Sequence, residues 1–468
     1  MKRSICAGGF LVVLLMAVST AGASDPLGLW QAAPAGKKAI QKSDPNDTWI
    51  RPDHAIGLSL DLDAMKLRLQ NVPKEGTAAR NPVHITLPLG DGTYGRFAVE
   101  ETSVMEPGLA ARYPELRTYI ARELDDPACS ARFDVTPRGF HGLIFTRAGD
   151  VYIDPTSRTD DRSYSCYYRK HYRRADPAEE AFSCTLHHVA ENAAQPKAAA
   201  QKGNSTTAAK TTTGASLRTY RLAMTADADF TAFYGGVSQA LAGMVTGMNR
   251  INGIYERDVA VRMVLVANND QLIFTSANDP HNGNLDGITA IIDGVIGNAN
   301  YDIGHLVQGG SGGGVAYLGV VCDSGLKGNG LTGSTTPNND PFWVDFVAHE
   351  IGHQFGGNHT FNGTGGSCSG GNRNGSTAYE PGSGSTVMAY AGICGADDLQ
   401  NNSDAYFHAA SIEEINAHVT GSAASCVQNT NTGNNPPVAS AGADYTIPRQ
   451  TSFELTGSAT DANGDSLT

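Results

Sequence analysis

Eleven residues of this chain, from His349 to His359, combine the side chains and the spacing that can hold a catalytic metal: His-Glu-Ile-Gly-His-Gln-Phe-Gly-Gly-Asn-His. On a helix, His349 and His353 would lie one turn apart on the same face, close enough to bind one ion. Neutral imidazole is a good ligand for Zn²⁺, and three protein ligands leave a fourth position open, as catalytic zinc sites do. The pattern therefore predicts a zinc site formed by His349, His353 and His359.

Two further positions in this segment have chemical roles. Glu350 follows the first ligand, where its carboxylate can act as a general base toward water that zinc activates. Gly356 can end the helix with a positive φ, a conformation that costs glycine little, so that the chain turns and brings His359 to the same metal. The preceding residues, 341–348, place apolar side chains on a helical period, with a proline near the start. The expected chemistry is metal-assisted hydrolysis.

The extended motif, with a methionine turn downstream, resembles the metzincin clan of zinc metalloproteases. Met388, in the segment Ser385–Tyr390, is identified as the turn methionine. Tyr390 resembles the tyrosine that astacin-like and serralysin-like members place near the metal, where its phenol can stabilise the oxyanion; the alternative is a tyrosine packed in the turn. Within the clan, residues 217–428 are most similar to bacterial reprolysin-like (adamalysin-related) secreted proteases. The chain departs from them at Thr360, where they have aspartate, and after Met388, where they have proline two positions on.

This resemblance implies an α+β metzincin (zincin) fold, which has a twisted mixed sheet, long helices, the active-site helix and the Met-turn, preceded by a β-rich propeptide domain. The hydrophobic pattern of the chain predicts strands and helices in an order compatible with this fold. The elements expected from it are a strand at 219–225, a long helix capped by Asp229 and reaching Arg250, a strand at 258–268, a helix at 287–299, and strands at 303–307 and 315–321.

The last of these strands is a candidate substrate site. In the clan, the strand before the active-site helix borders the cleft, and a peptide would bind there by adding itself as an extra strand. The residues in question are Val315, Ala316, Tyr317 and Leu318. An ordinary internal strand is the alternative.

Composition and the first residues indicate the compartment. The chain has 468 residues, a net charge of −13 and a pI of about 5.4, which argues against nucleic acid or an anionic membrane as the main partner. Residues 1–23 have a basic start, an apolar run and a small-residue end, the pattern of a secretory signal peptide. The run is too short for a comfortable membrane span, so we expect a secreted protein without a membrane anchor.

Export makes disulfides plausible. Of the eight cysteines, Cys6 would leave with the signal peptide. Four lie in the protease-like part and predict two disulfides, with three possible pairings: Cys322, Cys368, Cys394 and Cys426. Three lie in the amino-terminal half: Cys129, Cys166 and Cys184.

Residues 24–190 alternate strand and turn signals, with hairpin turns expected at 89–92 and 147–150 and a helix at 109–124. The resemblance implies that this part is the protein's own inhibitory propeptide. Cys184 is then the candidate cysteine switch, whose thiolate would fill the open zinc position, with Cys166 as the second choice. The alternative is that two of the three cysteines pair and the third has no such role.

The remaining segments are assigned by composition. Two segments have the composition of linkers, residues 191–216 and 429–437. Cleavage is expected in the first linker or after Arg173-Arg174. The alternative is that this arginine pair is only a surface feature. Residues 362–384 read as irregular, and 403–419 as a closing helix on which Glu413 and Glu414 are ordinary solvated charges. Residues 438–468 resemble the start of an immunoglobulin-like module of the PKD or cadherin kind, which we expect to be incomplete. Asp461, Asn463 and Asp465 have the spacing of a Ca²⁺ turn, a weak pattern.

The sequence as a whole predicts a secreted zinc-dependent endopeptidase, made as a latent precursor and acting on proteins or peptides. Two alternatives remain open. One is a secreted binding or adhesion protein on an inactive metzincin scaffold. The other keeps the zinc chemistry but serves a specialised toxin or peptide-processing role, which only substrate tests can separate from general proteolysis.

Overall fold

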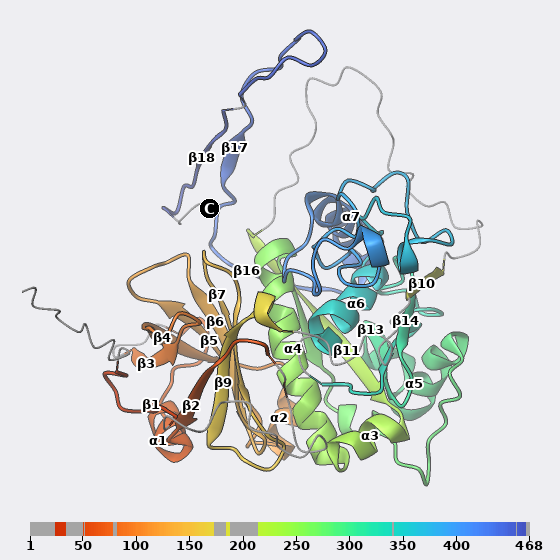
Figure 1. Cartoon of the computed structure of the whole chain (residues 1–468). Coiled ribbons are helices and arrows are strands. Elements are labelled where there is room, and N and C mark those ends of the chain that lie inside the picture. The colour runs from red at the N-terminus through yellow and green to blue at the C-terminus, as the bar shows by residue number, and fades with distance from the viewer. Residues whose placement is uncertain are drawn as a thin grey trace, which may run out of the picture.

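In the computed structural model, two regions of the chain pack against each other on either side of one long helix, α4 (Figure 1). The structure describes residues 24–33, 50, 52–77, 82–172, 184–187, 214–338, 341–454 and 456–464. The expected signal peptide, the pair Arg173-Arg174 and nearly all of the expected linker 191–216 lie outside the described residues.

The amino-terminal region, residues 24–172, is built on a nine-stranded antiparallel sheet with strand order β1-β2-β9-β8-β7-β6-β5-β4-β3. The hairpin turns expected at 89–92 and 147–150 are confirmed, since they join β3 to β4 and β7 to β8. Its elements are β1 (Trp30–Ala32), β2 (Ile56–Leu60), α1 (Leu62–Leu69), β3 (Val83–Pro88), β4 (Tyr94–Thr102), α2 (Pro107–Arg112), β5 (Arg117–Glu123), β6 (Ser130–Thr136), β7 (Gly139–Phe145), β8 (Val151–Pro155) and β9 (Ser163–Tyr168).

The helix expected at 109–124 is wrong. Only α2 is helical, and β5 begins five residues after it ends, at Arg117. The β5 segment has β-branched and aromatic residues at Thr118, Tyr119 and Ile120, and pairing with β4 on one side and β6 on the other decides its conformation.

The two faces of the nine-stranded sheet have different partners. Side chains such as Ile144 and Ile153 point into a core that the sheet forms with α1, whereas Leu143 and Tyr152, the neighbouring residues, point the other way and join the core around α4. The sheet therefore has a core of its own and shares a second one with the rest of the chain.

Polar side chains also join the two regions. On α4 (Val237–Val259), Thr246 Oγ1 donates to Asp134 Oδ1 at 2.8 Å and Arg250 Nη2 donates to Asp154 Oδ1 at 2.6 Å. Arg169, in a 3₁₀ turn after β9, forms a buried ion pair with Asp345. Burying a charge is costly unless it is paired, and each of these buried charges has a partner across the interface.

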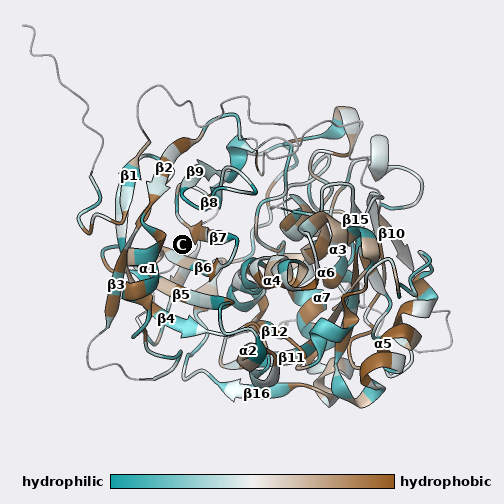
Figure 2. Cartoon of the chain, turned by 90° about the horizontal axis from the view of Figure 1, so that it is seen from below, coloured by the Kyte–Doolittle hydropathy of each residue, from teal (hydrophilic) through white to brown (hydrophobic). Residues whose placement is uncertain are grey.

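The carboxy-terminal region is organised on a second sheet with strand order β10-β14-β15-β13-β11-β12, in which β16 pairs with the free end of β11. Seen from below, the two sheets lie on opposite sides of α4 (Figure 2). Its strands are β10 (Cys184–His187), β11 (Ser216–Ala226), β12 (Val261–Leu265), β13 (Ile303–Gly309), β14 (Gly313–Tyr317), β15 (Gly330–Ser334) and β16 (Gln428–Asn431), and its helices are α3 (Ala228–Tyr234), α4, α5 (Ile288–Ile296), the π-helical turn η5 (Pro341–Val347), α6 (Ala348–Gln354) and α7 (Ala409–Thr420).

The expected strand and helix order is confirmed, with four corrections. The helix expected to end near Arg250 runs to Val259, so the strand expected at 258–268 begins only at Val261, as β12. The long helix is split: Asp227, not Asp229, caps α3, and Gly235 and Gly236, both with positive φ, separate α3 from α4. The strand expected at 315–321 ends at Tyr317. The sequence prediction missed β15, whose Gly-Leu-Thr-Gly-Ser has little strand character of its own, yet β15 lies between β13 and β14.

Both expected disulfides are present, as Cys322–Cys426 and Cys368–Cys394. The expected linker at 429–437 begins as strand β16, so its first residues are ordered against β11. Beyond it, β17 (Val438–Ser440) and β18 (Ser458–Thr460) form a small exposed hairpin, and the PKD- or cadherin-like module stays a prediction. None of the helices in the described ranges has the length and apolar character needed to cross a membrane.

Candidate metal centre

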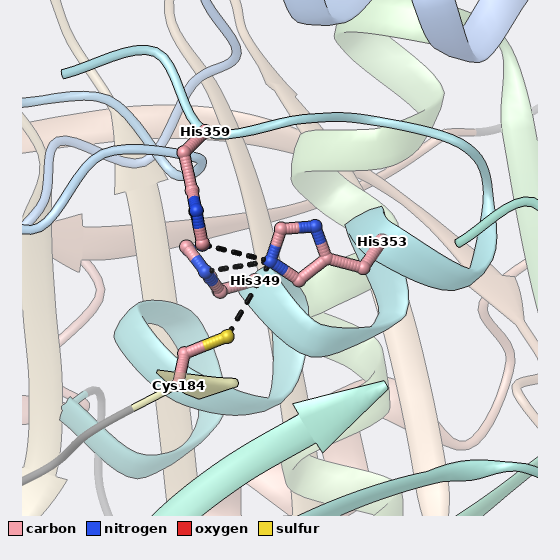
Figure 3. A group of neighbouring side chains, drawn as sticks. All are labelled: Cys184, His349, His353 and His359. Atoms are coloured by element: carbon pink, nitrogen blue, oxygen red, sulfur yellow. Dashed lines mark hydrogen bonds between the residues drawn. The ribbon is translucent and has the colours of Figure 1, made fainter. Parts of the chain in front are cut away.

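The three histidines of the motif converge on one point (Figure 3). His349 and His353 lie on α6, and Gly356, with φ +94°, turns the chain so that His359 joins them, as expected. The Nε2 atom of His353 lies 3.1 Å from that of His349 and 3.0 Å from that of His359.

Each imidazole is held in the orientation a metal ligand needs. The Nδ1 atoms of His349, His353 and His359 lie 2.7, 2.6 and 2.7 Å from the backbone carbonyl oxygens of Val387, Gly357 and Asn372. A carbonyl oxygen only accepts, so each Nδ1 carries the proton and each Nε2 lone pair faces the common centre.

A fourth donor completes the group. Cys184, on β10, places its Sγ 3.5 Å from His353 Nε2, and the four ligand atoms all lie within 4.8 Å of one another. Around a tetrahedral zinc ion with ordinary bond lengths, nitrogens stand about 3.4 Å apart and sulfur about 3.6 Å from nitrogen. The four side chains therefore fit zinc.

Burial sets the charge state of this group. It lowers the pKa of His349 to about 4 and, together with the neighbouring His349, that of His359 to about 3, so both are neutral ligands at neutral pH. Burial also raises the pKa of Cys184 well above its ordinary value and that of Glu350 to about 8. A bound cation would lower the pKa of the Glu350 carboxyl and of the Cys184 thiol, against the effect of burial. The donor set therefore suits a divalent metal.

Glu350 is the one carboxylate directed at this centre from α6. It is completely buried, and neither carboxylate oxygen has a well-formed hydrogen bond within the described structure. Its interacting neighbour is the Cys184 thiol, and a buried carboxylate with so few hydrogen-bond partners is rare outside functional sites. Its place depends on Gly314 of β14, because a Cβ on that glycine would stand 2.1 Å from Glu350 Oε1.

Tyr390 contacts the histidines, and Met388 contacts the helix that carries two of them. The Tyr390 hydroxyl donates to the backbone carbonyl of Cys184 at 3.2 Å, and its ring centroid lies 4.6 Å from that of His359. Met388 is fully buried with its Sδ against Gly352 of α6, where an added Cβ would come within 2.4 Å. The methionine turn therefore packs directly under the helix that carries two of the histidines.

The proposed edge strand is covered. β10 pairs with β14 in parallel, with Cys184 opposite Gly314 and Thr185 opposite Val315, and the remaining neighbour of β14 is β15. Leu318 lies beyond the end of the strand. Without β10, β14 would be the edge of the sheet.

The structure separates the other predicted residues from the centre. Cys166 lies in β9 in the amino-terminal sheet's own core, and Cys129, Cys166 and Cys184 are all free, so the alternative in which two of them form a disulfide is wrong. Asp465 of the expected Ca²⁺ turn lies outside the described residues.

One glutamate near the centre, Glu414, was assigned the wrong environment from the sequence, and another, Glu380, was not singled out. Glu414 was expected to be an ordinary solvated charge, but its carboxylate accepts two hydrogen bonds from Asn358. Glu380, which the sequence did not single out, is buried between Thr360 and Thr386. The only sequence signal for Glu380 is a lone acidic residue in a stretch rich in glycine and asparagine.

Comparison with known proteins finds one matching family model. Residues 216–418 match the family described as Metallo-peptidase family M12B Reprolysin-like, which supports a zinc-dependent metallopeptidase domain. A crystal structure of metalloproteinase-II from Bacteroides fragilis is similar, at 9% sequence identity and a TM-score of 0.41, over 77% of this chain and 96% of that one. No curated protein gives a significant match.

Proposed function

We propose that this protein is a secreted zinc endopeptidase made as a latent precursor, with zinc held by His349, His353 and His359. The observation that carries the proposal is the convergence of three imidazole Nε2 atoms, each ring oriented by a backbone carbonyl on Nδ1, beside the buried carboxylate of Glu350. The match of residues 216–418 to a metallopeptidase family supports it. The two disulfides suit an oxidising compartment outside the cell.

Each side chain of the site has a separate role in hydrolysis. Zinc, when bound, supplies Lewis-acid polarisation of the carbonyl and of water. Glu350 accepts a proton on its carboxylate from the attacking water and returns it to the leaving amine. Tyr390 donates its hydroxyl hydrogen to the developing oxyanion, a role that its hydrogen bond to the Cys184 carbonyl imitates. Met388 supports α6 from below.

Substrate peptides would bind as an added strand along β14, at Val315, Ala316 and Tyr317. In the precursor that position belongs to β10, which forms main-chain pairs with the same residues. Main-chain pairing is tolerant of side chains, so we expect unstructured proteins such as casein to be substrates.

Latency would follow from the same contact. β10 covers the edge of the sheet, and Cys184 brings a thiol to the fourth position beside the three histidines. Thiolate is a strong zinc ligand, so the amino-terminal region would block both the peptide site and the open metal position.

Replacement of Cys184 tests this latency. We expect the full-length Cys184→Ala precursor to keep zinc and to hydrolyse a short peptide that the parent precursor leaves uncut, while remaining slower than the activated enzyme because β10 still covers β14. The thiolate-to-metal charge-transfer band of the Co²⁺-substituted precursor should disappear. Cys166→Ala, at a cysteine in the sheet core, is the matched control and should keep both latency and the band. Latency and spectrum unchanged in Cys184→Ala would rule out the thiol as a ligand.

The decisive test of the function is zinc content together with casein hydrolysis. Both are measured on the precursor and on an activated form beginning near Leu217, prepared by limited proteolysis of the folded precursor. We expect one zinc per chain, and activity in the activated form that a chelator removes and added zinc restores. Zinc without cleavage of casein or of a peptide library would favour a binding protein on an inactive scaffold. No zinc in either form would contradict the proposal outright.

A further inference from the structure

His359 lies outside α6 and depends on contacts with other parts of the chain. His349 and His353 are set one turn apart by α6, but α6 ends at Gln354 and His359 lies in the irregular chain beyond Gly356. Its imidazole is oriented by the Asn372 carbonyl, and its own carbonyl accepts from Thr377 Oγ1 at 2.6 Å. The position of its backbone therefore has to be fixed through its neighbours, Asn358 and Thr360.

Glu380 holds the residue after His359. Its Oε1 accepts from Thr360 Oγ1 at 2.7 Å and also from Thr386 Oγ1, and its Oε2 accepts from the backbone N–H groups of Ser385 and Thr386 at 2.7 and 3.1 Å. The backbone N–H of Glu380 donates to the Thr360 carbonyl at 2.9 Å. One buried carboxylate thus fastens Thr360 to the start of the methionine turn.

The same turn orients the first ligand. Val387, the residue after Thr386, accepts through its carbonyl from His349 Nδ1 at 2.7 Å, and the Met388 carbonyl accepts from the Thr360 N–H at 3.2 Å. Because Glu380 bonds to both Thr360 and Thr386, it fixes the chain next to His359 and next to the group that orients His349.

Glu414 holds the residue before His359. It lies on α7, and its Oε2 and Oε1 accept from the backbone N and the side-chain Nδ2 of Asn358, both at 2.8 Å. Asn358 Oδ1 in turn accepts from Asn374 Nδ2 at 2.8 Å. Two carboxylates from distant parts of the chain therefore bracket the third histidine, one on each side.

We propose that Glu380 and Glu414 are positioning residues that hold His359 in its ligating place by binding Thr360 and Asn358, an inference that rests on the proposed zinc site. Without them, His349 and His353 would stay in register on α6 but His359 would sample positions away from the centre. Zinc affinity is expected to fall, because groups that orient metal ligands commonly contribute 10–100-fold to binding.

The test measures zinc affinity by chelator competition in the full chain carrying Cys184→Ala, so that binding reports the histidines. We expect Glu380→Ala and Glu414→Ala each to weaken zinc at least ~10-fold, with the double variant weaker still. Glu380→Gln should recover most of the affinity, because its amide oxygen can accept from the Ser385 and Thr386 N–H groups while its NH₂ donates to the two threonine hydroxyls. The Co²⁺ spectrum of the alanine variants should shift toward fewer nitrogen ligands.

Two further variants separate positioning from stability. Asp302→Asn alters a buried carboxylate at the start of β13 that accepts from Arg221, and it should lower the melting temperature without changing zinc affinity. Thr360→Val keeps Glu380 and its backbone hydrogen bond but removes the hydrogen bond between the Glu380 carboxylate and the Thr360 hydroxyl, and it should weaken zinc binding even if Glu380→Ala fails to fold. Unchanged affinity in Thr360→Val and Glu414→Ala, or an equal loss in Asp302→Asn, would overturn the inference. Failure of the proposed function is distinct, since it appears as missing hydrolysis or missing zinc in the parent chain.

Discussion

Replacing Glu350 by alanine is expected to lower peptide hydrolysis by the activated form about 10³- to 10⁴-fold while one zinc per chain remains bound. The range is the upper part of what a general acid–base residue contributes. Zinc should remain because the three Nε2 atoms and the carbonyls that orient them do not depend on Glu350. The measurement is kcat/KM on a fluorogenic peptide beside metal analysis of the same sample.

Two comparisons make this result specific. Glu413→Ala removes an exposed glutamate on α7 and should retain activity. Glu350→Ala should also fold at least as well as the parent chain, because it removes a buried carboxylate that has no well-formed hydrogen bond. Hydrolysis within ten-fold of the parent value would mean that another base, or none, serves the reaction.

The local part of this site could be predicted from sequence, and its surroundings could not. The i, i+4 spacing of His349 and His353 and the glycine that ends the helix are properties of one short segment, and the structure has them as expected. The contacts of Glu380 and Glu414 join residues 20 and 56 positions apart, as Thr360 to Glu380 and Asn358 to Glu414. The hydrophobic periodicity of a sequence carries no information about contacts between residues so far apart. Glu414 was therefore expected to be an ordinary surface charge.

The fold likewise has parts that local sequence predicts and parts that it does not. Individual strands could be anticipated where they are apolar, as in β13, but β15 and β10 become strands only because they pair with strands elsewhere in the chain. The segment at 109–124 was assigned to a helix from its own residues, but α2 ends at Arg112 and pairing with β4 and β6 makes residues 117–123 the strand β5. Tertiary pairing decides such segments.

Gly314→Ala is expected to lower hydrolysis about 100-fold with little loss of stability, because displacing a catalytic group by about an ångström has an effect of that size. The added methyl would meet Glu350 Oε1 at 2.1 Å, and a flexible side chain can move aside more easily than backbone. The fold is therefore expected to survive while the carboxylate leaves its place. The measurements are kcat/KM, zinc content and melting temperature of the activated form.

The matched control is another glycine-to-alanine change in the same region. Gly294, on the exposed side of α5, has nothing within 4 Å of the position a Cβ would take, so Gly294→Ala should keep full activity and raise stability slightly. If Gly314→Ala were as active as Gly294→Ala, the carboxylate position inferred for Glu350 would be incorrect. If it lost zinc as well as activity, the substitution would be acting on the histidines instead.

The Cys322–Cys426 bond matters for an enzyme that meets other copies of itself. The bond closes a loop with a sequence separation of 104, and His349, Glu350, His353, His359, Met388 and Tyr390 all lie inside it. A single self-inflicted cut anywhere between residues 322 and 426 would leave both fragments covalently joined through this bond. Such a molecule could be nicked without falling apart, and only reduction together with a cut would separate the pieces. On a gel, autolysis would therefore stay hidden until a thiol is added.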